Sequence, residues 1–255
     1  MSESQEKVII LTGASRGIGA ASAQYLLSQH HKLVLVSRTH AALDQLHFQY
    51  PDQVEVLAGD VSDFALGEKA VEIAVSRWGR LDSVIVNHGT LDPVKKVADV
   101  GVEEWRRAFD VNVFAGIAVI KPSIPHLRKS HGRIILTSSG ASVSAYQGWG
   151  AYGASKAVLN HLALTLSVEE PDITTVSVRP GVVDTEMQRE IREVHKGAMS
   201  EKDGKKFAGL KSEGGLLRPE QPGWVIAKLG VGAGRELSGR FVNWNEEDLG
   251  AFQEE

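Results

Sequence analysis

The sequence predicts a doubly wound α/β domain, in which helices cover both faces of a parallel sheet of about seven strands. Short apolar segments alternate with helix-length segments along most of the chain, a pattern typical of repeated strand–helix–strand units. The apolar segments are mostly continuous, as expected for strands buried on both faces. The 255 residues contain no repeat, low-complexity segment or linker that would divide them. We therefore expect one domain.

The expected elements follow this alternation. Strands are expected at residues 7–11, 32–36, 54–58, 83–86, 132–137, 174–178 and 240–244. Helices are expected at residues 17–28, 40–50, 63–78, 103–129 and 151–169, with a shorter helical segment around 221–229. The region 186–217 is rich in charged residues and glycine, and we expect it to be the loosest part. It is either a solvated surface insertion or a mobile flap over a site, and its position after the last crossover strand favours the flap.

Composition excludes several classes of protein. Hydrophobic residues make up 42% of the chain and charged residues 24%, which is ordinary for a globular protein. The net charge of -4 provides no basic field for nucleic acid or an anionic membrane. No uninterrupted apolar run reaches the roughly 20 residues that span a bilayer, and the polar first residues do not resemble a signal peptide. The absence of cysteine excludes disulfides and thiolate metal sites. We expect no metal centre and a cytoplasmic location, with the nucleus as the alternative.

A glycine-rich turn joins the first expected strand to the first expected helix. It reads Thr12-Gly13-Ala14-Ser15-Arg16-Gly17-Ile18-Gly19. Such a turn lets the backbone approach a pyrophosphate, which the free N–H groups of the helix N-terminus then bind. The spacing is G-x-x-x-G-x-G, which differs from the common G-x-G-x-x-G. The alternative is a tight turn with close helix packing. The strand–turn–helix context favours a dinucleotide site of the Rossmann type.

The end of the second expected strand indicates which dinucleotide binds. An NAD-binding domain usually carries an acidic residue there, which binds the ribose 2′-hydroxyl. This chain has Arg38 instead, and Arg16 lies within the glycine turn. Two guanidinium groups suit a 2′-phosphate, because each donates charge-assisted hydrogen bonds. We therefore expect NADP(H), although either arginine alone would be ordinary surface charge.

A candidate acid–base pair lies in the expected helix 151–169. Tyr152 and Lys156 stand four residues apart, which places both side chains on one helix face. A phenol titrates near ~10 in water, and a neighbouring ammonium favours the phenolate. We therefore expect the pKa of Tyr152 to be lowered towards neutral, as suits general acid–base catalysis. Ser139 ends the preceding strand, where its hydroxyl would share the same substrate oxygen. For an isolated pair, the alternative is a solvated helix surface.

Taken together, these motifs resemble those of the short-chain dehydrogenase/reductase family. The matches follow the family's order and spacing over nearly the whole chain: residues 12–19, Asp60-Val61, Asn87-His88-Gly89, Asn112, Ser139, Tyr152 with Lys156, and Pro180-Gly181 with Thr185. Residues 149–161 and 180–188 are also similar to those of the fungal benzil reductases, a group related to sepiapterin reductase. The resemblance implies a nicotinamide-dependent oxidoreductase.

The resemblance assigns four catalytic residues. Tyr152 is expected to protonate a carbonyl oxygen, and Ser139 to hydrogen-bond the same oxygen. Lys156 is expected to hold the nicotinamide ribose and to tune Tyr152. Asn112 is expected to kink its helix and hold a water in a proton relay to Lys156. The alternative for Asn112 is a polar residue whose hydrogen bonds are satisfied within its own helix.

The resemblance also implies the cofactor contacts. The adenine is expected at Asp60 and Val61, the middle of the cofactor at Asn87 and Gly89, and the nicotinamide carboxamide at residues 183–185. Asp60 would alternatively cap a helix, and residues 180–181 would alternatively form only a turn. The whole expected set is Gly13, Ser15, Arg16, Gly17, Ile18, Gly19, Arg38, Asp60, Val61, Asn87, Gly89, Tyr152, Lys156, Pro180, Val183 and Thr185.

Three further features concern the substrate. His88 stands where the family usually has a small residue, and we favour a packed loop histidine over a substrate contact. Tyr146 and Trp149 form either an aromatic wall for a flat or aryl dicarbonyl substrate or a part of the core. Glu247 and Asp248 lie in the region where sepiapterin reductases carry the acidic residue that anchors the pterin.

The favoured hypothesis is an NADPH-dependent reductase of ketones or α-dicarbonyls of the benzil or sepiapterin kind. A non-catalytic NADP(H)-binding sensor or scaffold is disfavoured, because such relatives usually lose the tyrosine or the lysine. A 3-oxoacyl or alcohol oxidoreductase would use the same catalytic groups, and only a substrate panel separates it. We expect a small-molecule carbonyl substrate and no nucleic-acid or membrane partner. We also expect a homodimer or homotetramer that pairs through the helices at 103–129 and 151–169.

Overall fold

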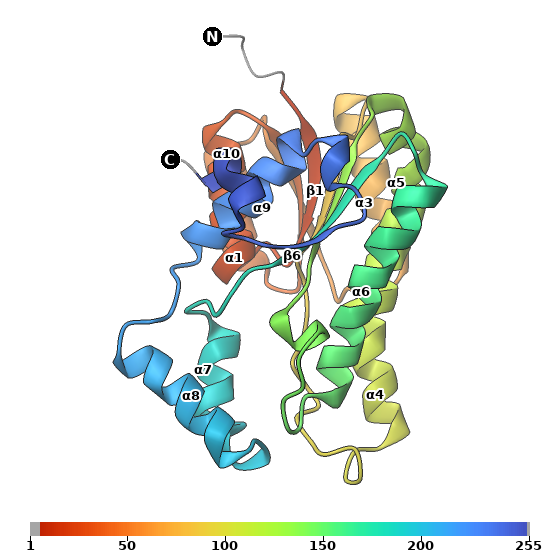
Figure 1. The fold of residues 1–255 in the computed structure, drawn as a ribbon. Helices are drawn as coiled ribbons and strands as arrows, with labels where there is room; N and C mark the ends of the chain where they lie inside the picture. Colours follow the sequence, from red (N-terminus) through yellow and green to blue (C-terminus); the bar gives the residue numbers. More distant parts are fainter. Residues whose placement is uncertain (1–5, 254–255) are drawn as a thin grey trace.

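The computed structural model describes residues 6–253, in which seven strands form one sheet (Figure 1). The strands are β1 (Val8–Thr12), β2 (Lys32–Ser37), β3 (Val54–Ala58), β4 (Ser83–Val86), β5 (Arg133–Thr137), β6 (Thr174–Arg179) and β7 (Phe241–Asn243). Their order is β3-β2-β1-β4-β5-β6-β7, and every neighbouring pair is parallel. The predicted parallel sheet is confirmed, and the expected strand ends differ from the observed ones by a single residue at most.

Helices cover both faces of the sheet. They are α1 (Gly17–Ser28), α2 (His40–Gln49), α3 (Ala65–Trp78), α4 (Val102–Phe109), α5 (Ala115–Ser130), α6 (Gly150–Glu169), α7 (Glu186–Glu193), α8 (Glu201–Ser212), α9 (Glu220–Gly232) and α10 (Gly250–Gln253). On one face α1 packs against α9, and on the other α3 packs against α5 (Figure 1). The predicted doubly wound architecture, with helices on both faces, is therefore confirmed.

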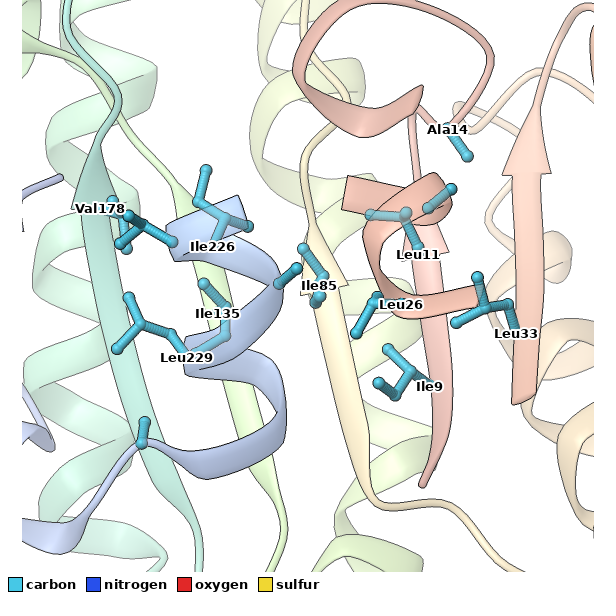
Figure 2. Close-up of a cluster of buried hydrophobic side chains, with 14 of the residues drawn as sticks. Ile9, Leu11, Ala14, Leu26, Leu33, Ile85, Ile135, Val178, Ile226 and Leu229 are labelled. Atoms are coloured by element: carbon cyan, nitrogen blue, oxygen red, sulfur yellow. The ribbon is translucent and has the colours of Figure 1, made fainter. Parts of the chain in front are cut away.

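Alternate residues of β1 explain how the two faces are built. Ile9 and Leu11 pack towards α1 and α9, whereas Val8 and Ile10 pack towards α3 and α5. Figure 2 shows the first of these two layers, in which Leu26 of α1 and Leu229 of α9 lie over the strands. Because both faces of the strand are buried, its sequence is apolar at every position, which is the pattern that predicted a parallel sheet.

The single helix expected at residues 103–129 is instead divided. A π-helical turn, Asp110–Phe114, separates α4 from α5 and contains Asn112. The helix is therefore interrupted at Asn112, where the backbone forms a wider π-helical turn. The joined stretch Val102–Ser130 is the one helix of the described chain with the length and apolar composition to cross a membrane. It packs against α3 and α6, and 44% of its most apolar window is buried inside the protein.

The region expected to be loosest contains two helices, α7 and α8. In Figure 1 they project beyond the carboxyl ends of the strands, across from the ends of α4 and α6. The two ends of the region are tied together, because Leu217 N–H donates to the Val182 carbonyl and Asp184 N–H donates to the Leu217 carbonyl. The region is therefore a folded extension of the domain on the side where the strands end.

The strand order reverses between β1 and β4, which lie side by side although β2 and β3 intervene in sequence. In doubly wound sheets, a crevice opens at the carboxyl ends of the strands at such a point, and ligands bind there. The glycine turn follows β1, and Asn87 follows β4. The fold thus brings the expected cofactor residues to one edge of the sheet.

Candidate active site

A cavity of about 870 Å³ opens at this switch point. This volume lies within the ~300–1,000 Å³ range of small-molecule and cofactor sites. Its wall is formed by the glycine turn, the carboxyl ends of β2 to β6 with the residues that follow them, the start of α6, and residues of α4, α7 and α8. Nearly all the expected site residues line it: Gly13, Ser15, Arg16, Gly17, Ile18, Arg38, Asp60, Val61, Asn87, Gly89, Ser139, Tyr152, Lys156, Pro180, Val183 and Thr185. Gly19 and Asn112 lie behind this surface.

The glycine turn is shaped by close backbone contacts. Gly13 and Gly17 have φ angles of +68° and +55°, in the left-handed region that favours glycine. A Cβ atom on Gly13 would lie 2.8 Å from the Cα of His88, and one on Gly19 would lie 2.1 Å from the Gly13 carbonyl oxygen. The turn therefore packs tightly, as its alternative interpretation required, and it also exposes backbone at the cavity. A dinucleotide fits this cradle.

Two arginines stand at the cofactor end of the cavity. Arg16 and Arg38 are both exposed, and both line the wall. Between them, the Ser37 hydroxyl donates a 2.8 Å hydrogen bond to the Ser15 hydroxyl. No acidic side chain directly follows β2, but the charge of Arg38 acts on Asp60 and that of Arg16 acts on Glu186, so each arginine has a carboxylate nearby.

Asp60 follows β3 and forms a local turn with Ser62; α3 begins at Ala65 without a side-chain cap, so the alternative that Asp60 caps this helix is wrong. Its Oδ1 atom accepts hydrogen bonds from the Ser62 backbone (3.0 Å) and hydroxyl (2.8 Å). These two hydrogen bonds lower the pKa of Asp60, and the charge of Arg38 adds a smaller lowering effect. Asp60 and Val61 nevertheless line the cavity, so the local turn and a ligand contact are compatible.

Ser139 and Tyr152 meet at the inner end of the cavity. Ser139 begins a short turn after β5, and its Oγ atom accepts a 3.1 Å hydrogen bond from the Ala141 backbone. Tyr152 lies in the first turn of α6 and is only 7% exposed. Burial raises the pKa of Tyr152, while its hydrogen bond with the Ser139 side chain lowers it by a smaller amount. The expected lowering of this pKa by Lys156 is therefore wrong for the protein alone, because burial dominates and the opposing effect comes from Ser139.

Lys156 shares the α6 face with Tyr152, as the spacing predicted, but it is anchored elsewhere. Its Nζ atom donates a 2.7 Å hydrogen bond to the Thr137 carbonyl and lies 5.8 Å from the centre of the Tyr152 ring. The side chain is 3% exposed, and burial lowers the pKa of Lys156 to about 8. Lysine and phenol are thus neighbours at the wall of the cavity.

Asn112 fixes the loop after β4. Its Oδ1 atom accepts from the Thr90 backbone (2.8 Å), and its Nδ2 atom donates to the Thr90 carbonyl (2.9 Å) and the Ser155 hydroxyl (3.0 Å). These partners lie outside its own helix, so the alternative of local satisfaction is wrong. A Cβ atom on Gly89 would lie 3.3 Å from both Asn112 Oδ1 and Lys156 Nζ, so both groups lie close to the same side of this glycine.

Asn87 and His88 hold the glycine turn against β4. Asn87 Nδ2 donates to the Gly13 carbonyl (3.2 Å), and Asn87 Oδ1 accepts from the Thr137 hydroxyl (3.3 Å). The His88 ring is buried with its Nδ1 atom 2.7 Å from the Thr12 hydroxyl. Burial, and then the charge of Lys156, lowers the pKa of His88 to about 4. His88 is therefore a neutral packed histidine, as the favoured interpretation described.

The substrate end of the cavity has an aromatic wall. Trp149 stacks on Phe207 of α8, with ring centroids 5.4 Å apart and an interplanar angle of 14°. Tyr146 packs against both of them, and the edge of Tyr152 meets Trp149 at 88°. These rings belong to one hydrophobic cluster and also line the cavity. Tyr146 and Trp149 therefore belong to the core and also line the cavity, while their role towards an aryl substrate stays a prediction.

Beyond β6, the chain crosses the mouth of the cavity. Gly181 has a φ angle of +79°, and Thr185 caps α7 by accepting from the Gln188 backbone. The flap hypothesis placed residues 186–217 over a site but named none of the wall residues that α7 and α8 supply: Met187, Gln188, Ile191 and Phe207. One available signal was Thr185 followed by helix-forming residues, which is typical of a helix start.

Glu247 and Asp248 do not reach this cavity. Both are exposed beyond β7, and Asp248 accepts a 2.8 Å hydrogen bond from Arg240. Neither side chain is among the wall residues, so these two positions supply no acidic group to the cavity. Within residues 6–253, no three histidine, aspartate or glutamate side chains gather as metal ligands would.

A dinucleotide-type crevice with a serine, a tyrosine and a lysine at its inner end defines the class of protein as an oxidoreductase of the nicotinamide-dependent kind. The sequence model of the short chain dehydrogenase family matches residues 7–196. The chain therefore belongs to the short-chain dehydrogenase/reductase family, whose members bind NAD(P)(H), act on small molecules and commonly form oligomers.

Three relatives illustrate the similarity. The chain is 44% identical to an uncharacterized oxidoreductase of Schizosaccharomyces pombe, over 96% of this chain and 98% of that protein. It is 38% identical to benzil reductase ((S)-benzoin forming) of Saccharomyces cerevisiae, over 97% and 99% respectively. The crystal structure of a short-chain dehydrogenase/reductase from Saccharomyces cerevisiae superimposes with a TM-score of 0.95, at 36% identity, over 97% of this chain and all of that one.

Proposed function

We propose that this oxidoreductase is an NADPH-dependent carbonyl reductase that acts on aryl ketones or α-dicarbonyls. The observation that carries the proposal is the meeting of Ser139 and Tyr152 at the inner end of a cavity whose other end is the glycine turn. A nicotinamide cofactor, when bound, would supply the hydride that the carbonyl carbon accepts. The chain itself supplies hydrogen bonds, a proton and an apolar enclosure.

Tyr152 acts as the proton donor in this proposal. The raised pKa of Tyr152 keeps the phenol protonated at neutral pH, which suits the reduction direction. The hydroxyl groups of Ser139 and Tyr152 stabilise the negative charge that develops on the carbonyl oxygen. Because Ser139 Oγ already accepts from the Ala141 backbone, its own hydrogen is directed elsewhere and serves as a donor.

Lys156 and Asn112 maintain this arrangement. Lys156 offers its ammonium beside the phenol, where a ribose hydroxyl would fit between them. Asn112 holds the Thr90 backbone and the Ser155 hydroxyl, which lie on the two segments that flank Lys156. Loss of Asn112 would therefore loosen the loop after β4 and the start of α6 together.

The cofactor preference follows from Arg16 and Arg38. Both guanidinium groups line the cofactor end of the cavity, where a 2′-phosphate would receive their hydrogen bonds. The substrate preference follows from the rings of Tyr146, Trp149 and Phe207, which offer stacking surface to a flat aryl group. The similarity to a benzil reductase supports the same class of substrate.

Assembly and location belong to the proposal as well. Phe114 in the π-helical turn, Ile117 on α5, and Leu164 and Val168 on α6 expose between 38% and 78% of their surface. These apolar residues support pairing of a second copy through the two helices, giving a dimer or tetramer. We place the protein in the cytoplasm, where NADPH is available.

The test is NADPH oxidation in the presence of benzil, with Tyr152→Phe as the variant. The substitution removes the proton and retains the ring, so we expect turnover to fall by about a hundredfold or more. NADPH binding, followed by the fluorescence of the bound cofactor, serves as the control and should stay within a few fold. Equal turnover in the variant would contradict the proposal.

A further inference from the structure

Gln188 is a buried polar residue in the substrate part of the cavity, with no role in the proposed proton transfer. Its side chain is 3% exposed and lies on α7 among the wall residues. Its neighbours Met187 and Ile191 on the same helix are apolar and also line the cavity. A carboxamide in such surroundings is costly unless both its oxygen and its nitrogen have partners.

The oxygen of this amide has a partner within the chain. Arg192 Nη1 donates a 3.0 Å hydrogen bond to Gln188 Oε1, one helical turn further along α7. A guanidinium group only donates, so this contact fixes which end of the amide is oxygen and which is nitrogen. The Nε2 group is therefore the free end of the side chain.

The nitrogen has no partner within the described residues. No group there accepts a hydrogen bond from Gln188 Nε2, and the cavity is the space that this buried side chain borders. The indole N–H of Trp149, in the same wall, likewise has no acceptor among residues 6–253. The Trp149 nitrogen is itself fully buried, so Gln188 Nε2 is the donor that a ligand can reach, and it favours a ligand with one more acceptor oxygen than a simple ketone.

We propose that Gln188 is a specificity-determining residue, whose Nε2 group donates a hydrogen bond to the second oxygen of a vicinal dicarbonyl substrate. This inference rests on the proposed function. The hydroxyls of Ser139 and Tyr152 bind the carbonyl that is reduced, and the amide binds the adjacent one. A monoketone leaves this amide unpaired in an apolar wall, so that the site selects the dicarbonyl.

The test compares benzil with deoxybenzoin, which has the same two phenyl rings but a methylene group in place of one carbonyl. The readout is the ratio of their kcat/KM values with NADPH. If deoxybenzoin turns over too slowly to measure, its affinity is measured instead as an inhibition constant in the benzil assay. We expect Gln188→Met to lower this ratio by about tenfold, the effect of one lost hydrogen bond.

Gln188→Glu is the matched second variant, because a carboxylate still accepts from Arg192 but donates nothing. It should lower the ratio at least as much, and it covers the case in which Gln188→Met does not fold. A ratio within twofold of wild type in a folded variant would overturn the inference, as would an equal loss for both compounds. If the wild-type protein oxidises NADPH with neither benzil nor any other carbonyl compound, the proposed function fails instead.

Discussion

Lys156 Nζ donates a 2.7 Å hydrogen bond to the carbonyl oxygen of Thr137, the last residue of β5. This contact ties the start of α6 to the end of a central strand. It also holds the ammonium in a buried place, where the pKa of Lys156 falls to about 8. The lysine therefore changes its charge at a much lower pH than a free lysine side chain does.

Lys156→Met should remove a pH dependence of stability. The pKa of Lys156 is about 8 in the folded protein and 10.5 for a lysine side chain in water, so the unfolded chain binds more protons between these values. The free energy of unfolding therefore rises with pH across this window, by on the order of 3 kcal/mol. We expect urea unfolding from pH 7.5 to 10.5 to show a shallower rise for the variant. Parallel curves would contradict the buried, shifted lysine.

His88→Asn should change stability at the acid side. The pKa of His88 is about 4 when folded and 6.5 for a histidine side chain in water, so the unfolded chain again binds more protons between these values. The wild-type protein therefore loses stability as pH falls from 6.5 through 4, and His88 accounts for roughly 3 kcal/mol of that loss. The variant lacks this contribution. Unfolding curves at pH 7 and 4.5 measure the difference, and an equal loss in both proteins would show that His88 is not buried as described.

The sequence predicted the parts of the site that depend on local order along the chain. The glycine turn, the spacing of Tyr152 and Lys156, and the strand ends all follow from short segments and their periodicity. The direction of the Tyr152 pKa shift could not be predicted from short segments. The burial of Tyr152 in a cluster that includes Phe207 depends on packing between segments that are distant in the sequence. Gln188 was equally hidden, since its environment exists only once α7 folds across the cavity.

The two helices within residues 186–217 were not predicted for a second reason, which is that composition was given more weight than the helix-start signal. Ser200 caps α8 by accepting from the Asp203 backbone, which is an ordinary helix start in the sequence. The charge and glycine content of this region outweighed that signal. Phe207, the buried residue of α8, docks on Trp149 and gives the helix a tertiary partner. The composition of residues 186–217 therefore did not reveal α8, whose buried Phe207 packs on a distant segment.

Arg38→Ala should shift the coenzyme preference. The exposed guanidinium at the rim of the cavity is expected to bind a 2′-phosphate, so we expect the KM for NADPH to rise about tenfold while that for NADH stays nearly constant. Arg77→Ala is the matched control, because this arginine pairs with Glu55 away from the cavity. Steady-state kinetics with both coenzymes measure the shift. An equal effect on NADPH and NADH would contradict the phosphate contact.

Gly13→Ala should weaken both cofactor binding and stability, and Gly79→Ala separates the causes. Gly13 and Gly79 have similar φ angles of +68° and +74°, so alanine suffers the same backbone strain of about 1 kcal/mol at either position. A Cβ atom on Gly79 meets nothing within 4 Å, whereas one on Gly13 would lie 2.8 Å from the Cα of His88. Because that neighbour is backbone, the turn itself must move.

We expect Gly79→Ala to keep NADPH affinity, and Gly13→Ala to lose at least about tenfold in affinity together with a further 1–2 kcal/mol of stability. Equal behaviour of the two variants in thermal unfolding and cofactor titration would mean that the close approach of the turn to β4 has no bearing on the cofactor site.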